Sequence, residues 1–401
     1  MKALEDAPFV DVFSEGFRAD PGAILDPLRS ETGLVRTPVG TSVIRRDLVQ
    51  SLFSDRRLRS AVADLVRMQG VTEGVIHDLV TNSLLATEGP QHARIRRMVN
   101  RAFTPRAVDP HRQVIADTLR TLLDPFADRG SCEFMAEVAD HYPIQVMCAL
   151  LGVPDADHED FATWNKAMTW VLSFDLTSHL EEAAWGAEQM NAYVGRLIDE
   201  RRRQPRDDMV TALAQVEDGG DRLSDLELRS LIAGLLFAGF DTTRNQLGLA
   251  MALFADHPDQ WALLVERPEL APSAVEEVMR VSGAVTVAPR IAAEDVAIDG
   301  YLVPAGTMVA LATGAANFDP AAYLAAREVD ITASREPHLT FGGGPHYCLG
   351  ANLARAEMQE ALTLLAERMP TFALDGEPTW RSPFGIFGPE TLPLRFAPTS
   401  A

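Results

Sequence analysis

The chain carries the stretch Phe341-Gly342-Gly343-Gly344-Pro345-His346-Tyr347-Cys348-Leu349-Gly350, in which glycines stand on both sides of a single cysteine. A helical pattern begins directly afterwards, so the sulfur lies at a predicted helix N-terminus, where the dipole favours a thiolate. Neighbouring N–H groups can tune its donor strength, and glycine lets the backbone lie flat against a bulky planar ligand. The pattern indicates a thiolate ligand for haem iron. The alternative is a glycine-rich turn around a buried structural cysteine.

A long helix is predicted ahead of that stretch. Ser224-Asp225-Leu226-Glu227 is a capping box, which predicts a helix start, and the helical pattern continues without proline to Asp256, before Pro258. About 32 residues at ~1.5 Å each give a helix of ~48 Å, long enough to cross a domain. Its centre, Leu231 to Phe240, is apolar on all sides and is predicted to be buried.

The acidic residue Asp241 follows this apolar run directly, and a buried acid is costly unless it has a partner. A structural role is an ion pair with Arg244 at i,i+3. A chemical role involves Thr242, whose hydroxyl can bond a carbonyl one turn back and locally open the helix. Asp241 can then relay protons toward Thr242, which is general acid work. The two roles are compatible if Asp241 moves between Arg244 and Thr242.

A basic pair opens a helix that is predicted to reach residue 103. His92 and Arg96 are i,i+4 and share one face, which suits a carboxylate; the alternative is a solvated basic face. Arg94, Arg97 and Arg101 fall on a different face. That face predicts either a docking site for an acidic redox partner or a solvated surface.

The rest of the chain favours helices with a few short strands. A hairpin is predicted within residues 33–46, a helical pattern over 131–154, and short strands within 296–309. His158-Glu159-Asp160 lacks the His-Glu-x-x-His spacing of a metal site and is interpreted as a solvated helix start.

The cysteine stretch resembles the haem-binding loop of the cytochrome P450 family, Phe-Gly-x-Gly-x-His-x-Cys-x-Gly, at every fixed position. Further motifs that resemble this family follow in the family's order and cover nearly the whole chain. They are His92/Arg96, Ala238-Gly239-Phe240-Asp241-Thr242, Glu277/Arg280, Arg290, Arg335 and the loop that contains Cys348. The fold that the resemblance implies is mainly α with small β-sheets, arranged as the family's triangular helical prism.

The resemblance implies haem b as the cofactor. The residues implied to bind it are His92, Arg96 and Arg290 at the propionates, Ala238, His346 and Gly350 elsewhere, and Cys348 as the metal ligand. Small residues at 238 and 239 would leave room for a diatomic ligand above the iron. Asp241 and Thr242 would be the catalytic residues that supply protons.

A structural triad and a substrate pocket are also implied by the resemblance. The triad is Glu277, Arg280 and Arg335, and its role would be to brace the cysteine loop. A C-terminal turn from Phe384 to Pro393 would return to the pocket. The implied pocket residues are Trp170, Phe174, Phe237, Ala238, Thr286 and Ile386, with Phe387 beside them on that turn.

The sequence departs from the family pattern at two phenylalanines. Phe318, in Asn317-Phe318-Asp319-Pro320, replaces the usual arginine of Asn-Arg-Asp-Pro and cannot make its contacts, so we expect different local packing. Phe240 is bulkier than the commonest residues at its place in the oxygen-activation motif. It is predicted either to alter the pocket or to pack outward.

Composition limits the remaining possibilities. The 401 residues are 47% hydrophobic and show no linker or repeat, so we expect one domain over 1–401. Three scattered cysteines indicate a reducing, cytoplasmic compartment. The N-terminus lacks a signal-peptide pattern, and the longest apolar run is too short to span a bilayer. A net charge of −21 argues against nucleic acid and anionic membranes.

The function that the resemblance implies is a haem-thiolate monooxygenase. It would hydroxylate or epoxidise an apolar small molecule of terpenoid, steroid, macrolide or aromatic type, as in secondary metabolism. No Gly-x-Gly-x-x-Gly unit is present, so electrons would come from a ferredoxin and its reductase; we expect a monomer. The alternatives are a peroxide-driven or non-oxygenating haem-thiolate enzyme and a non-catalytic haem-binding module.

Overall fold

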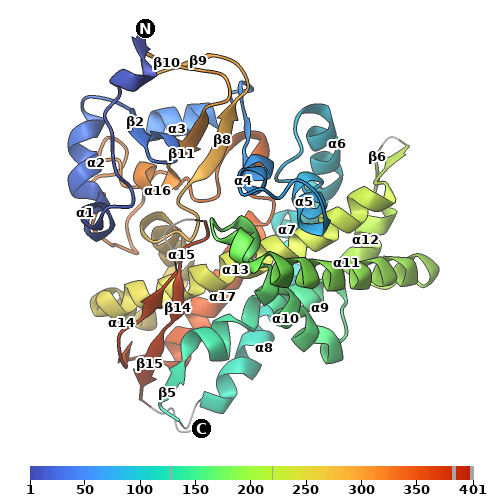
Figure 1. Cartoon of the computed structure of the whole chain (residues 1–401). Coiled ribbons are helices and arrows are strands. Elements are labelled where there is room, and N and C mark those ends of the chain that lie inside the picture. Colours follow the sequence, from blue (N-terminus) through green and yellow to red (C-terminus); the bar gives the residue numbers. More distant parts are fainter. Residues whose placement is uncertain (127–128, 219, 382–384, 398–401) are drawn as a thin grey trace.

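The computed structural model of the chain describes residues 1–126, 129–218, 220–381 and 385–397. Helices dominate, as predicted (Figure 1). Those of the first half are α1 (Glu15–Ala19), α2 (Pro21–Arg29), α3 (Arg46–Leu52), α4 (Val62–Met68), α5 (Val75–Thr81), α6 (Gly89–Val99), α7 (Pro105–Val108), α8 (Arg112–Leu123) and α9 (Tyr142–Leu151). The later ones are α10 (His158–Met168), α11 (Leu180–Arg203), α12 (Met209–Gln215), α13 (Asp225–Asp256), α14 (Pro258–Glu266), α15 (Ala271–Val281), α16 (Thr313–Ala316) and α17 (Ala351–Arg368).

The strands are short and form small sheets. The larger sheet has the order β2 (Leu34–Thr37), β3 (Gly40–Val43), β11 (Met308–Leu311), β8 (Ala288–Ala292) and β4 (Leu58–Ser60). A second sheet joins β1 (Lys2–Ala3), β10 (Tyr301–Val303) and β9 (Val296–Ile298), and a third joins β12 (Phe372–Leu374), β15 (Pro393–Phe396) and β5 (Ser131–Glu133). Two further pairs are β13 (Thr379–Trp380) with β14 (Pro389–Thr391) and β6 (Glu217–Asp218) with β7 (Asp221–Arg222).

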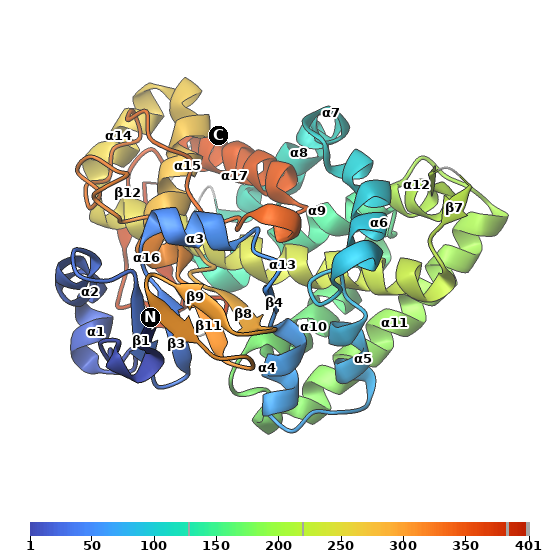
Figure 2. The same cartoon turned by 90° about the horizontal axis from the view of Figure 1, so that it is seen from above.

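The predicted long helix is α13, and its start is the predicted one. Ser224 Oγ accepts from the Glu227 N–H, and the Glu227 carboxylate accepts from the Ser224 N–H at 2.9 Å, which completes the capping box. The helix is 32 residues long. It crosses the middle of the molecule and contacts both α17 and α11 (Figure 2). Most of its apolar centre is buried, as predicted, but Gly234, Leu235, Ala238 and Gly239 are only half-buried, so one side of it is not fully covered by other elements.

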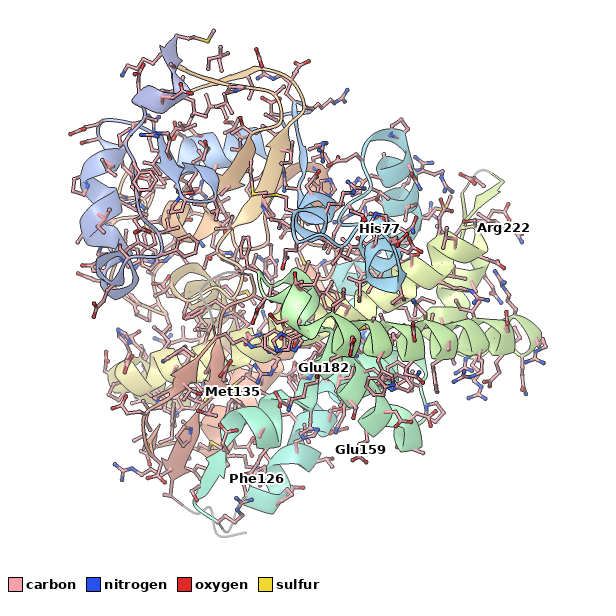
Figure 3. The ribbon with its side chains drawn as sticks, in the orientation of Figure 1. His77, Phe126, Met135, Glu159, Glu182 and Arg222 are labelled. Carbon is pink, nitrogen blue, oxygen red and sulfur yellow. The ribbon has the colours of Figure 1, made fainter. Side chains whose placement is uncertain are left out.

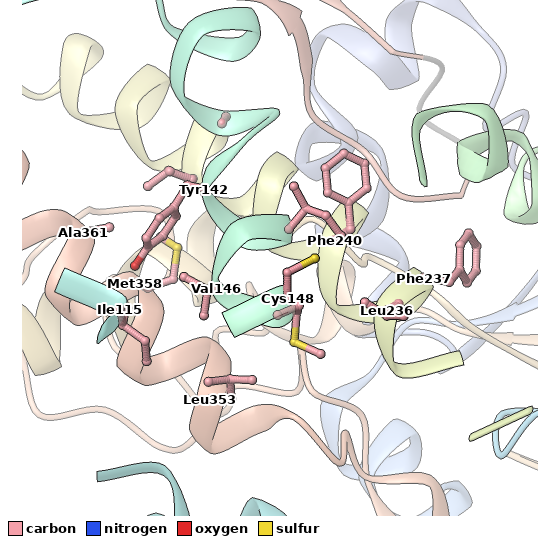
Figure 4. Close-up of a cluster of buried hydrophobic side chains, with 14 of the residues drawn as sticks. Ile115, Tyr142, Val146, Cys148, Leu236, Phe237, Phe240, Leu353, Met358 and Ala361 are labelled. Atoms are coloured by element: carbon pink, nitrogen blue, oxygen red, sulfur yellow. The ribbon is translucent and has the colours of Figure 1, made fainter. Parts of the chain in front are cut away.

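The hydrophobic core lies around this helix. The main cluster of buried side chains includes the apolar centre of α13, most of α9 and the inward face of α17. Figure 4 shows part of it, with Tyr142 and Cys148 of α9 and Phe240 of α13. Phe240 is only 2% exposed. Phe240 therefore packs in the hydrophobic core, whereas the sequence predicted that it would alter the pocket or pack outward.

Two sequence predictions need correction or restriction. The helical pattern predicted from residue 131 is wrong at its start, because Ser131–Glu133 is strand β5 and pairs with β15. A helix pattern cannot reveal a partner strand that lies far along the chain. In the C-terminal turn, Phe384 lies outside the described residues, so the prediction for that turn is followed only from residue 385.

Candidate active site

The cysteine loop is a compact turn that precedes α17. The Cys348 N–H donates to the Phe341 carbonyl at 2.9 Å, which closes the loop on itself. Gly344 has φ +60°, and a Cβ there would overlap the Phe53 carbonyl group. Only glycine adopts this backbone at so close an approach. The loop geometry therefore requires a glycine at position 344. At Gly350, by contrast, nothing lies within 4 Å of the place where a Cβ would stand.

Cys348 differs from the other two cysteines in its surroundings. Burial raises the pKa of its thiol, and the Gly350 N–H, Arg96 and Arg355 oppose that shift. The helix dipole predicted a thiolate; burial of the sulfur acts against the charged form, and coordination to a metal would deprotonate the thiol. Cys132 and Cys148 are core residues, 5% and 0% exposed. Cys348 is thus the cysteine surrounded by groups that stabilise a thiolate.

Two histidines meet beside this loop. The rings of His92, on α6, and His346 have centroids 4.3 Å apart. Burial first, then His346 and Arg96, lowers the pKa of His92 to about 4. Neither Nε2 has a hydrogen-bond partner within the described residues, although His346 Nε2 lies 3.2 Å from a Glu88 carboxylate oxygen. Buried polar atoms are normally satisfied, so His92 Nε2, which has no polar partner among the described residues, fits a further acceptor at this place, whereas His346 Nε2 already faces Glu88.

Two arginines extend the same basic region. Arg96 donates to the Tyr347 carbonyl, and Arg290 Nη1 donates to the Pro289 carbonyl at 3.0 Å. Burial lowers the pKa of both guanidinium groups. Arg290 is buried and Arg96 is half-buried, and in the described part of the chain neither has an ion-pair partner, which is unusual for a buried arginine such as Arg290. Arginines without an ion-pair partner fit the propionates of a haem, and the glycine-rich cysteine loop beside them fits its ring and iron.

The acid–alcohol pair lies on α13. Thr242 Oγ1 donates to the Ala238 carbonyl at 2.6 Å, which is the predicted bond. The expected local opening of the helix is absent, because α13 is continuous from Asp225 to Asp256; a carbonyl oxygen has two lone pairs and can accept twice. Asp241 is 2% exposed, and burial raises its pKa against the opposing effects of Arg381, Arg244 and Asn245.

The predicted pairing of Asp241 with Arg244 is wrong. Arg244 turns to Asp140, at the end of a π-helical turn, and Arg381 Nη1 takes its place at 2.7 Å from Asp241 Oδ1. Asn245 Nδ2 donates to the same oxygen at 3.0 Å. The residue that sequence reasoning missed is Arg381, because no local spacing connects it with Asp241.

The predicted triad residues come together. Glu277 Oε2 lies 2.8 Å from Arg280 Nε and 3.1 Å from Arg335 Nε. Phe318 packs under this group, with its ring centroid 5.7 Å from Arg280 Cζ and 5.6 Å from Arg327 Cζ. The aromatic face thus occupies the place of the family's arginine through cation–π contacts. Leu339, shortly before the cysteine loop, donates its N–H to Asn317 Oδ1 at 2.8 Å. The Glu277 triad and Asn317 therefore both support the segment that leads into the cysteine loop.

The predicted pocket residues differ in their contacts and in their exposure to solvent. Val285 pairs with Ile386, which brings Thr286 near the C-terminal turn. Trp170 stacks on His179 with centroids 3.6 Å apart. Phe237 is buried and Ala238 is half-buried on α13, but Phe174 is 49% exposed and therefore lies at the surface.

Three polar residues near the site carry no motif. Gln69 connects α4 to residues 173–176, which follow the predicted pocket residue Trp170. Its Nε2 donates to the Ser173 carbonyl at 3.0 Å, and its Oε1 accepts from the Leu176 N–H at 3.2 Å. Glu88 Oε1 accepts from the Ser60 N–H at 2.5 Å. Glu357 is buried on α17, and burial raises its pKa to about 8. An acid within a helical apolar pattern was the only signal for Glu357.

No cluster of three or more His, Cys, Asp or Glu side chains among the described residues could hold a metal ion, and none of the helices described is long and apolar enough to cross a membrane. Glu159, in the run considered for a metal, points outward from the start of α10 (Figure 3).

Comparison with known proteins places these features in context. Residues 68–377 match the family model of cytochrome P450. The luteothin monooxygenase of Streptomyces thioluteus is 38% identical over 98% of this chain and 96% of its own length. The mycinamicin IV hydroxylase/epoxidase of Micromonospora griseorubida is 41% identical over 79% of this chain and 80% of its own. A solved structure of P450BioI, in complex with an acyl carrier protein ligated to hexadec-9Z-enoic acid, superposes with a TM-score of 0.88 at 31% identity, covering 96% of this chain and all of that one.

Proposed function

The chain belongs to the cytochrome P450 family and is a monooxygenase of that family, and on that premise we propose that it hydroxylates or epoxidises an apolar, macrolide- or polyketide-type molecule with haem b held at Cys348. The observation that carries the proposal is that the cysteine loop lies beside a basic region in which His92 Nε2 has no hydrogen-bond partner and Arg96 and Arg290 have no ion-pair partner among the described residues, with His346 next to His92.

The haem, when bound, supplies the iron at which dioxygen is reduced. The chain's own contribution begins with Cys348, whose sulfur would ligate that iron with help from the Gly350 N–H. Arg96 and Arg290 would each gain a carboxylate partner, and His92 would gain an acceptor for its free ring nitrogen. Ala238 and Gly350 would leave space for the ring.

Asp241 and Thr242 would handle protons on the other face. Asp241 is an acid whose pKa is raised by burial, so it can hold a proton nearer neutrality than an exposed aspartate. The Thr242 hydroxyl donates its own hydrogen to the Ala238 carbonyl and keeps its lone pairs for a second partner. This arrangement orients an acceptor next to the acid.

The substrate class rests on the named relatives and on the pocket. Two of the curated relatives are named for luteothin and mycinamicin IV. With Phe174 at the surface, the candidate pocket residues are Trp170, Phe237, Ala238, Thr286 and Ile386, all but Thr286 apolar. Apolar walls with few polar groups suit a large hydrophobic molecule.

The remaining proposals concern the setting of the reaction. Electrons would come from a ferredoxin and its reductase, and the protein would act in the cytoplasm as a monomer built of one domain. The absence of a spanning helix among the described residues is compatible with this setting.

The test is the source of oxygen in the product. Haem-loaded protein is incubated with a macrolide library, ¹⁸O₂, and a ferredoxin with its reductase, after candidates are chosen by the low-to-high spin shift of the Soret band. We expect one ¹⁸O atom per product molecule. Product formed with peroxide but not with reduced ferredoxin and dioxygen would instead support the peroxide-driven alternative.

A further inference from the structure

Asp241 has a charged partner 140 residues away in the chain. Arg381 Nη1 donates to both of its carboxylate oxygens, at 2.7 Å to Oδ1 and 3.0 Å to Oδ2. Within the described ranges, Arg381 forms the only ion pair with Asp241.

The other charged groups around Asp241 are paired with one another. Arg244, on the same helix, forms an ion pair with Asp140, and Lys166 Nζ lies 3.9 Å from the other oxygen of Asp140. Arg244 also donates to the Pro389 carbonyl at 3.3 Å. Its charge is thus compensated, which leaves Arg381 as the counter-ion of Asp241.

Arg381 is attached to the loop of residues 385–388. Its backbone N–H donates to the Gly388 carbonyl at 3.0 Å. Gly388 in turn abuts α13, because a Cβ at that position would overlap the Asn245 side chain. Asn245 is the other hydrogen-bond donor to Asp241. The loop and the carboxylate are therefore connected through both donors.

The same loop contacts the proposed substrate pocket. Ile386 pairs with Val285, next to Thr286. Gly385 has φ +95°, and its Cα lies so close to the Leu172 carbonyl that a Cβ there would approach it to 2.8 Å. Loop 385–388 thus lies against Leu172, against Val285 beside the proposed pocket, and against α13. A substrate that moves this loop moves the attachment of Arg381 as well.

The two partners differ in access to water. The side chain of Arg381 is 21% exposed and that of Asp241 is 2% exposed. Arg381 can therefore leave into solvent, whereas Asp241 cannot. A carboxylate left alone at that depth is strongly disfavoured and is converted to the neutral acid.

We propose that Arg381 is a positioning residue that holds Asp241 as a carboxylate while loop 385–388 is seated, and that displacement of the loop by substrate releases Asp241 to carry a proton. This rests on the function proposed above. The proton passes from water to the Asp241 carboxylate and leaves toward the Thr242 hydroxyl. The carboxylate is thereby regenerated and can pair with Arg381 again.

The test follows the protonation of Asp241 itself. The infrared C=O stretch of a protonated carboxyl group is recorded against pH in the haem-loaded protein and assigned by its loss in Asp241→Asn. In Arg381→Gln we expect the midpoint to rise by at least about one pH unit, because an opposite charge at this distance lowers a carboxyl pKa by roughly 1–3 units. Arg381→Lys should return most of the shift. Arg368→Gln, which removes the partner of Asp124 elsewhere, is the matched control and should leave the midpoint unchanged.

A second variant keeps every charge in place. Gly388→Ala should displace the loop from Asn245 and raise the Asp241 midpoint in the same direction. An unchanged midpoint in either Arg381→Gln or Gly388→Ala, with the far-UV circular dichroism of the parent, overturns the proposal. Failure of the proposed function is distinguishable, since it would appear as absence of ¹⁸O from every product while the infrared shift remained.

Discussion

At the scale of single residues, several buried polar atoms form no hydrogen bond within the described chain, and some of them lie near the site. His92 Nε2, His346 Nε2 and Glu357 Oε1 are such atoms. The two histidines lie beside the cysteine loop, where the proposed haem would satisfy His92. Glu357 lies on α17, and its other oxygen is 3.5 Å from Thr243 Oγ1. Burial without a counter-ion makes it a neutral acid near pH 7.

The first prediction concerns the hydroxyl of Thr242. In Thr242→Ala we expect reductant consumption to continue while the fraction that appears as product falls by roughly tenfold or more, since a positioned proton-transfer group contributes that much. The measurement is the ratio of product formed to reductant consumed. Thr243→Ala, the adjacent hydroxyl, is the control. Full coupling in Thr242→Ala would remove this residue from the mechanism.

The second prediction concerns Glu357 and pH. Its pKa is raised from 4.5 to about 8 in the folded state, so the folded state binds the proton more tightly than the unfolded state. The stability linked to that proton is present below pH 4.5 and is lost as pH rises toward 8. Glu357→Gln should flatten this part of the curve of unfolding free energy against pH, measured by urea denaturation. A curve parallel to the parent's would show that Glu357 does not titrate there.

At the scale of elements, the connections between segments decide how the site opens. Gln69, at the end of α4, is bonded to both Ser173 and Leu176 through its side chain. Thr177 Oγ1 adds a bond to the Gln69 carbonyl at 3.2 Å. These contacts connect residues 173–177 to α4. Gly385 and Leu172 connect the same segment to the C-terminal loop.

The third prediction removes the Gln69 side-chain bonds. In Gln69→Leu, the Leu176 amide loses its acceptor, and a net hydrogen bond of about 1 kcal/mol corresponds to roughly fivefold faster local opening. Hydrogen exchange of a peptide over residues 173–177 measures this rate. Gln113→Leu, which breaks an exposed bond to Asp117, is the matched control. Unchanged exchange at 173–177 would mean that other contacts hold the segment.

At the scale of the whole molecule, the features with local signals could be predicted and those with distant partners could not. The capping box and the proline-free run predicted α13, and Thr242 found the predicted carbonyl one turn back. The ion pair of Asp241 with Arg381 and the pairing of Ser131–Glu133 with β15 join residues far apart in the sequence. Spacing within one helix carries no information about them. Composition likewise indicated the charge of −21 but not how it is distributed.

The fourth prediction uses that charge distribution. Arg101 is exposed on a 3-10 turn, Asn100–Phe103, that contacts α17 in a strongly acidic protein, and an acidic ferredoxin would be attracted to it. Arg101→Glu should raise the KM for ferredoxin severalfold at low salt and leave the substrate-induced spin shift unchanged. Arg57→Glu, another exposed arginine, is the control. Equal KM values in both variants would argue that the partner docks elsewhere.

The most direct test of the central claim is the spectrum of the reduced, carbon monoxide-bound protein. With Cys348 as the iron ligand, the parent should show the red-shifted Soret band of a thiolate-ligated haem. Cys348→Ser should lose that band, whereas Cys132→Ser and Cys148→Ser should keep it. A red-shifted band that persists in Cys348→Ser would contradict the assignment of the ligand.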